Sequence, residues 1–166
     1  CIYISHIHPD HCSEKTLNYI HKSIPIYIHS YHEKFLKLKL ERLGFKVIEL
    51  ENNKRSCIKN NLHINIIASD NCDPELCYKF FGCKSLDNSQ GSKQIDTISV
   101  IDDNKFSVVN VNDSPFELSK TSIENLKKKY DHFDLLLTGY TGAGPYPQCV
   151  DNFSLKEKIY FGEQKK

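Results

Sequence analysis

Three histidines and one aspartate lie within six positions near the start of the chain. Residues 4–12 read ISHIHPDHC, which places His6, His8, Asp10 and His11 in the spacing His-x-His-x-Asp-His. Neutral imidazole nitrogens and carboxylate oxygens are the ligands that zinc and the harder divalent metals accept. This stretch therefore predicts a metal site, and a solvated histidine-rich turn is the alternative.

The spacing suggests how these side chains converge. In an extended segment, positions i and i+2 point the same way, so His6 and His8 can present two nitrogens to one ion. Pro9 cannot continue strand pairing and turns the chain, which lets Asp10 and His11 face the same cavity. Four ligands exceed what one ion usually receives from so short a segment. We therefore expect two adjacent ions.

The motif resembles the signature of the metallo-β-lactamase-fold superfamily, whose members bind one or two metals at the mouth of an αββα sandwich. Residues 4–11, with VNVND at 109–113 and GAGPYPQC at 142–149, are also similar to the branch that contains CMP-N-acetylneuraminate hydroxylase and related bacterial sugar-pathway proteins. The first motif indicates the superfamily, and the other two indicate only the branch. The resemblance implies an α/β fold of the metallo-β-lactamase type.

Length and composition agree with one globular domain over residues 1–166. A chain of 166 residues can form its own core, and 39% apolar with 26% charged residues is ordinary for such a protein. The net charge of +1 gives no electrostatic reason to expect nucleic acid or an anionic membrane as partner. No apolar run approaches a membrane span of about 18 residues. We expect a cytoplasmic protein with a small-molecule substrate, while its oligomeric state cannot be read.

The chain begins with Cys1 and contains no methionine. We therefore expect it to be a portion of a longer protein. The resemblance agrees, because several strands normally precede the histidine motif in that superfamily. The sandwich is expected to be incomplete at the N-terminus.

Seven cysteines without a Cys-x-x-Cys pair favour reduced thiols over a disulfide framework. Cys72, Cys77 and Cys83, with His63, could form a separate structural zinc site. Their spacing matches no common zinc pattern, so ordinary thiols are the other interpretation. His63 itself alternates with apolar residues in a predicted strand, which places it on the surface.

The first 50 residues predict alternating strands and helices. In order, these are the strand before the motif, a helix from Ser13 to about His21, a strand over 24–28, a helix opened by a Ser30–Glu33 capping box and ended by Gly44, and a strand over 45–50. This order implies crossover connections, with helices packed against a sheet.

The remaining residues are less regular and predict further strands and helices. In order, the elements are a strand over 62–66, a long loop over 69–94, a hairpin of 97–101 with 106–111, a helix from a Thr121–Glu124 capping box to Tyr130, a buried strand over 133–137 and a last helix capped by Ser154 and Glu157. The hairpin delivers Asp113 at a strand end, where open sheets commonly place ligands.

Asp113 is the candidate for a carboxylate that bridges the two ions, by resemblance to the superfamily's later metal aspartate. Its alternative is an Asx-turn residue before proline. Farther along, Gly142 and Gly144 allow the backbone to approach a substrate closely, while Tyr140 and Tyr146 could stack on a base or sugar. A tight rigid turn explains these four residues equally well.

The pattern also has gaps. The superfamily usually supplies a further histidine between the motif and the later aspartate, and another near the C-terminal end. The intervening histidines are not in the expected loop, and Asp70 could substitute for one of them. His132 is interpreted as a helix-end residue. The missing ligands lie outside this chain, or the site holds a single ion.

The leading hypothesis is a metal-dependent hydrolase that uses a metal-bound hydroxide on a small phosphorylated or sugar-derived substrate. His6 and His8 would hold the first ion and His11 the second. Asp10 would anchor that ion or orient the nucleophile, so Asp10 and Asp113 are the candidate catalytic residues. The expected cofactor is zinc, as two ions, with iron or manganese as alternatives.

Two other classes stay open. One is an oxygen-dependent hydroxylase of a nucleotide sugar, which the resemblance to the sialic acid enzyme implies. That family carries a Rieske iron-sulfur domain, and no Cys-x-His pair of that kind is present here. The other is a non-catalytic metal-binding module.

Overall fold

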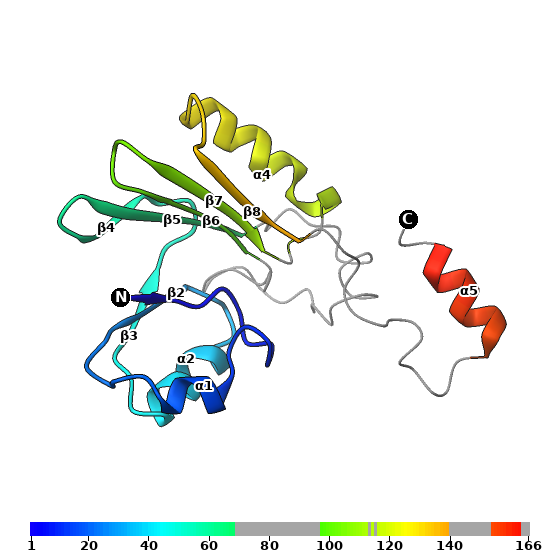
Figure 1. Ribbon diagram of the computed structural model, residues 1–166, viewed down its shortest axis with the longest axis horizontal. Helices are drawn as coiled ribbons and strands as arrows, with labels where there is room; N and C mark the ends of the chain where they lie inside the picture. Colours follow the sequence, from blue (N-terminus) through cyan, green and yellow to red (C-terminus); the bar gives the residue numbers. More distant parts are fainter. Residues whose placement is uncertain (69–96, 113, 115, 140–153, 164–166) are drawn as a thin grey trace.

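Two β-sheets lie face to face between two layers of helices in the computed structural model (Figure 1). The structure describes residues 1–68, 97–112, 114, 116–139 and 154–163. Among these residues, no helix is long and apolar enough to cross a membrane.

The first sheet is parallel and has the order β1-β2-β3. Its strands are β1 (Ile2–Tyr3), β2 (Ile26–His29) and β3 (Val47–Leu50), connected by α1 (Glu14–Asn18) and α2 (Phe35–Arg42). The predicted alternation of strands and helices is thus confirmed. Because all three strands are parallel, their C-terminal ends meet at one edge of the sheet.

The helix ends confirm two of three expected signals. Ser13 caps α1, since its Oγ accepts a hydrogen bond from the Thr16 amide at 3.3 Å. Gly44 follows α2 with φ +86°, a left-handed conformation typical of helix ends. The predicted capping box at Ser30 is wrong: its amide bonds to the Leu50 carbonyl at 2.8 Å, so this residue still pairs with β3 and the helix begins only at Phe35.

The second sheet has five strands in the order β4-β5-β6-β7-β8. They are β4 (Ser56–Lys59), β5 (Leu62–Ala68), β6 (Thr97–Asp102), β7 (Ser107–Asn112) and β8 (Leu135–Thr138). The β6–β7 hairpin is antiparallel, as predicted, whereas β8 pairs with β7 in parallel. Sequence reasoning missed β4, because its short, mostly polar segment carries no clear apolar alternation.

α4 (Phe116–Lys129) connects β7 to β8. It begins five residues before the predicted capping box, so Thr121 lies inside the helix and that box is wrong. The sequence after Pro115 has no helix breaker before Thr121, which lets the helix start directly after the proline.

Three apolar clusters lie between the four layers and pack them together. The first, which includes Leu17, Leu36 and Leu40, packs α1 and α2 against the first sheet. The second joins the two sheets through Tyr27, Leu50, Ile64 and Ile66, and the third packs Leu126 of α4 against Ile67, Ile98, Val100 and Val109. The layer order is therefore α-β-β-α, which confirms the predicted sandwich.

The edge strand β8 differs from the prediction. Leu135, Leu136 and Leu137 are 45%, 59% and 45% exposed, so the expected buried strand is wrong in its burial. β8 lies at the edge of the sheet, and the cluster under α4 draws its strand residues from β5, β6 and β7 instead.

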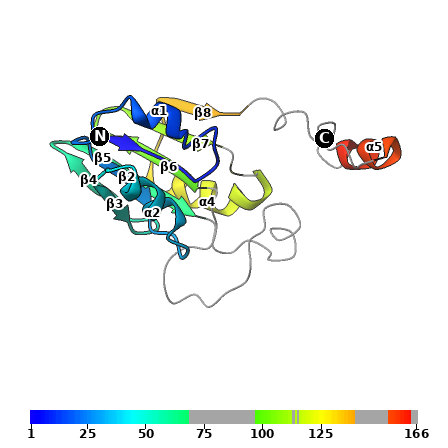
Figure 2. The same cartoon turned by 90° about the horizontal axis from the view of Figure 1, so that it is seen from below.

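The last helix, α5 (Leu155–Glu163), lies apart from the four layers in both views (Figures 1 and 2). Its predicted capping box is confirmed. The Ser154 amide donates to Glu157 Oε2 at 2.8 Å, and the Glu157 amide donates to Ser154 Oγ at 3.3 Å.

Candidate metal centre

The histidine motif follows β1 directly, at the C-terminal edge of the parallel sheet. The Ile4 amide bonds to the Tyr27 carbonyl at 3.1 Å, and the Tyr31 hydroxyl donates to the Ser5 carbonyl. Both contacts hold the segment against the end of β2. The His8 carbonyl then accepts from the Cys12 amide at 2.8 Å, which closes a turn. This is the edge at which open parallel sheets commonly bind ligands.

The turn brings the motif side chains together. His6 Nε2 lies 2.9 Å from His8 Nδ1, and the His6 and His11 ring centroids are 4.3 Å apart. His11 Nε2 lies 3.2 Å from Asp10 Oδ2. His6 and His8 lie beyond the end of β1 at Tyr3, and the turn closed by the His8 carbonyl brings Asp10 and His11 round to them.

Burial changes along the motif. His6 is 1% exposed, whereas His8 and Asp10 are exposed to solvent. His11 has an intermediate position. His6 therefore forms the buried bottom of the cluster, whereas His8 and Asp10 form its solvent-exposed side, through which a small molecule can approach.

The second sheet also reaches this cluster. Asn112, the last residue of β7, places its Nδ2 3.3 Å from His6 Nδ1, and Ser5 Oγ lies 3.0 Å from the same nitrogen. Sequence reasoning missed both residues, although each directly precedes a candidate ligand. The remaining candidates lie outside the described residues: Asp70, Cys72, Cys77, Cys83, Asp113, Tyr140, Gly142, Gly144 and Tyr146.

The donor set fits a divalent metal in its chemistry, although the described residues contain no group of three His, Cys, Asp or Glu side chains arranged around one ion. Within the motif the donors pair with one another: His6 Nε2 with His8 Nδ1, and His11 Nε2 with Asp10. Two nitrogens bound to one zinc ion are separated by about 3.3 Å in tetrahedral geometry, or by about 2.9 Å at a right angle. The His6–His8 separation of 2.9 Å is already in that range.

His29 lies deep at the same edge of the sheet. It is 0% exposed, and its ring packs edge-on against Tyr31 with centroids 5.1 Å apart. Neither ring nitrogen of His29 or His32 has a hydrogen-bond partner within the described parts of the chain. Burial, with a contribution from the Lys34 charge, lowers the pKa of His29 from 6.5 to about 4.

This lowered pKa predicts a loss of stability in mild acid. Between pH 6.5 and about 4 the unfolded chain binds the His29 proton more readily, so the stability is complete above pH 6.5 and declines as the pH falls through this window. We expect this group to lower the free energy of unfolding by about 2 kcal/mol between pH 7 and pH 5. Urea unfolding of the wild type and of His29→Leu at both pH values measures it. Equal pH dependence in the two proteins would refute the assignment.

His63 belongs to a different cluster. As the alternation predicts, it points away from the inter-sheet core; its side chain is 17% exposed, and Arg55 Nη2 lies 3.0 Å from its Nδ1. A cavity of about 400 Å³ lies beside this network, lined by Arg55, Asp102 and Tyr130 among others.

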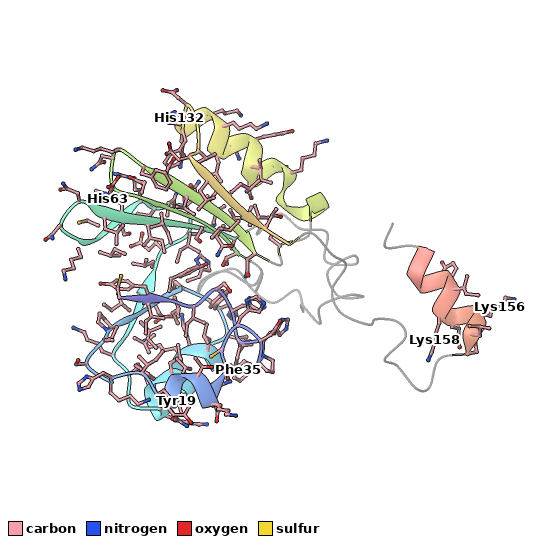
Figure 3. The ribbon with its side chains drawn as sticks, in the orientation of Figure 1. Tyr19, Phe35, His63, His132, Lys156 and Lys158 are labelled. Atoms are coloured by element: carbon pink, nitrogen blue, oxygen red, sulfur yellow. The ribbon has the colours of Figure 1, made fainter. Side chains whose placement is uncertain are left out.

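His132, 75% exposed, follows α4 as predicted (Figure 3).

No protein-family model and no curated protein sequence matches the chain. Several solved structures, among them the following three, are similar to it in fold. An isothiocyanate hydrolase from Delia radicum gut bacteria is 16% identical, with a TM-score of 0.52 over 76% of this chain and 45% of that one. A possible metal-dependent hydrolase from Veillonella parvula DSM 2008 is 18% identical, with a TM-score of 0.54 over 79% of this chain and 45% of that one.

The third is CmlA β-hydroxylase in a mutant form, 19% identical, with a TM-score of 0.57 over 81% of this chain and 24% of that one. The chain thus spans less than half the length of each of these proteins. The partial coverage fits an incomplete fold. Together with the α-β-β-α layer order, these similarities show that the chain has the metallo-β-lactamase fold.

Proposed function

We propose that this chain carries the metal-binding part of a metal-dependent hydrolase. The observation that supports the proposal is the convergence of His6, His8, His11 and Asp10 at the C-terminal edge of the parallel sheet. Two of the proteins with similar folds are a hydrolase and a possible metal-dependent hydrolase. At such low sequence identity these similarities support the fold alone. The activity of this chain is therefore inferred from its own donor groups.

The proposed metal is zinc, as two ions. His6 and His8 would bind the first ion and His11 the second, with Asp113 as the bridging carboxylate; iron and manganese accept the same donor types. When bound, the metal supplies a water molecule of lowered pKa near neutral pH. The protein's own groups position the site. His6 is held at the buried bottom of the cluster, and Asp10 beside His11 can accept or orient a proton at the solvent-exposed side.

The proposed substrate is a small phosphorylated or sugar-derived molecule. Tyr140 and Tyr146 would stack on its ring, while Gly142 and Gly144 would let the backbone approach it. Nucleic acid and membrane are not proposed as partners, since the net charge of +1 offers no attraction to either. The cytoplasmic location stays a prediction.

A second candidate is an oxygen-dependent hydroxylase. The similarity in fold to CmlA β-hydroxylase, with a TM-score of 0.57, supports this second candidate function. Imidazole and carboxylate donors suit non-haem iron as well as zinc, so the donor types alone do not separate the two activities.

The test is a comparison of two reactions on the full chain. We expect the zinc-loaded protein to hydrolyse p-nitrophenyl phosphodiesters or lactones, and the same protein carrying His6→Ala to lose this activity. His132→Ala is the matched control, because His132 is 75% exposed and outside the motif. Oxygen consumption by the Fe(II)-loaded protein without hydrolysis would replace the proposal with the hydroxylase. Absence of both activities would leave a metal-binding module and refute the hydrolase.

A further inference from the structure

We propose that Asn112 is a positioning residue that holds the ring of His6 and can stabilise either of its tautomers. The inference rests on the proposed metal site, because its consequence is that His6 Nε2 becomes available to an ion. It goes beyond that site by assigning a role to a residue of the second sheet that is not itself a metal ligand.

The backbone at Asn112 is unusual for a strand residue. Its φ is +56°, in the left-handed region that non-glycine residues rarely adopt, and the β7–β8 register shifts between Asn110 and Asn112. The Asn112 amide bonds to Asn110 Oδ1 at 3.0 Å, which stabilises the distortion. Asparagine tolerates this conformation better than most residues. The distortion therefore re-aims the last side chain of β7.

The re-aimed side chain meets His6 across the two sheets. Asn112 Nδ2 lies 3.3 Å from His6 Nδ1, on the opposite side of the ring from Nε2, which lies 2.9 Å from His8 Nδ1. Within the described ranges, the three other non-glycine residues with positive φ are also asparagines, Asn53, Asn60 and Asn104. Each lies between strands rather than at the end of one beside the motif. Asn112 thus combines a distorted strand end with a contact to the most buried motif histidine.

The amide can serve either tautomer of the imidazole. When Asn112 Nδ2 and the Ser5 hydroxyl, 3.0 Å away, both donate to His6 Nδ1, the ring proton sits on Nε2, from which it can donate to His8 Nδ1. A metal requires the lone pair of Nε2, so the ring proton must then move to Nδ1. Rotation of the Asn112 amide presents its Oδ1 to that Nδ1–H. One side chain can therefore stabilise both arrangements without a change in net charge.

Two variants separate the side chain from the backbone. Asn112→Gly keeps a residue that accepts positive φ but removes the amide, whereas Asn112→Asp keeps an oxygen acceptor of the same length. Asn60→Gly is the matched control, because Asn60 has φ +52° in an exposed turn between β4 and β5. Urea unfolding of all variants reports whether each still folds.

The first readout does not involve a metal. Long-range ¹H–¹⁵N NMR of the full chain should show His6 mainly as the Nε2–H tautomer in the wild type and in Asn60→Gly. Asn112→Asp should shift it toward Nδ1–H, and Asn112→Gly should give a mixture. An unchanged tautomer ratio in both Asn112 variants would overturn the inference.

The second readout is zinc affinity by chelator competition. Asn112→Gly should weaken zinc binding by about 10-fold, because one of the two partners of His6 Nδ1 is lost while Ser5 Oγ stays 3.0 Å from that nitrogen. Asn112→Asp should stay within about threefold of the wild type. An equal loss in Asn60→Gly would overturn the inference. If the wild type binds no zinc, the proposed function fails, and the tautomer experiment still decides the role of Asn112.

Discussion

Replacing His6 with alanine should weaken zinc binding by the full chain at least 100-fold. His6 is 1% exposed, its Nε2 lies 2.9 Å from His8 Nδ1, and its ring packs against His11. It is therefore the motif residue that contacts both other imidazoles. Loss of an outer partner of a ligating histidine already costs about 10- to 100-fold in affinity, so loss of the ligand itself should cost more.

Chelator competition with zinc measures this affinity, and His132→Ala is the control for the loss of a histidine outside the motif. The control should bind zinc as the wild type does, because His132 is exposed and follows α4. Should His6→Ala retain zinc within a few fold of the wild type, the motif would not be the site that holds the ion.

Replacing Arg55 with alanine should lower the free energy of unfolding by about 2–3 kcal/mol. Arg55 Nε donates to Asp102 Oδ2 at 3.0 Å, Nη2 donates to Asp102 Oδ1, and the same nitrogen reaches Asn104 Oδ1 at 2.6 Å. The Asp102 side chain is only 7% exposed, so the variant leaves a mostly buried carboxylate without its cation. Arg55 itself is 38% exposed, so solvent screening makes the expected loss smaller than the roughly 3–5 kcal/mol that follows when a fully buried ion pair is broken.

The pH dependence checks this cause. The Arg55 guanidinium holds the pKa of Asp102 below its ordinary value of 3.8, so the stabilisation is present above that pH and is lost as Asp102 is protonated in stronger acid. Urea unfolding at pH 7 and pH 3 should show the Arg55→Ala deficit shrinking at the lower pH. The double variant Arg55→Ala with Asp102→Asn should recover part of the loss at pH 7. A deficit that is the same at both pH values would contradict the ion-pair explanation.

Much of the fold could be predicted because local patterns and tertiary packing agree. Ser13 and Ser154 occupy the cap positions that their side chains favour, and the β6–β7 hairpin follows from two apolar runs around a polar turn. The parallel first sheet follows from strands that alternate with helices. In these elements, the residue types that favour the local structure also provide its buried face.

Other elements depend on distant residues that a local pattern does not reveal. Ser30 has the residues of a capping box, but its amide pairs with Leu50 on the neighbouring strand. The three leucines of β8 look like a buried strand, and only the strand order shows that they lie at an edge. Hydrophobicity predicts that a residue favours burial, but it does not identify the neighbour that covers it.

The candidate site shows the same division. The spacing within residues 6–11 was sufficient to predict that three histidines and one aspartate come together, because they lie on one short turn. The contact from Asn112 spans 106 positions along the sequence and depends on a left-handed residue at the end of β7. No local pattern predicts such a contact, because it arises from the packing of one sheet on the other.

X-ray absorption at the zinc edge of the loaded full chain tests the central claim most directly. If residues 6–11 hold the ion, the spectrum should show at least two imidazole nitrogens at about 2.0–2.1 Å from zinc, and this signal should be lost in His6→Ala combined with His8→Ala. A spectrum dominated by sulfur at about 2.3 Å, or one that the double variant leaves unchanged, would place the ion elsewhere and contradict the account.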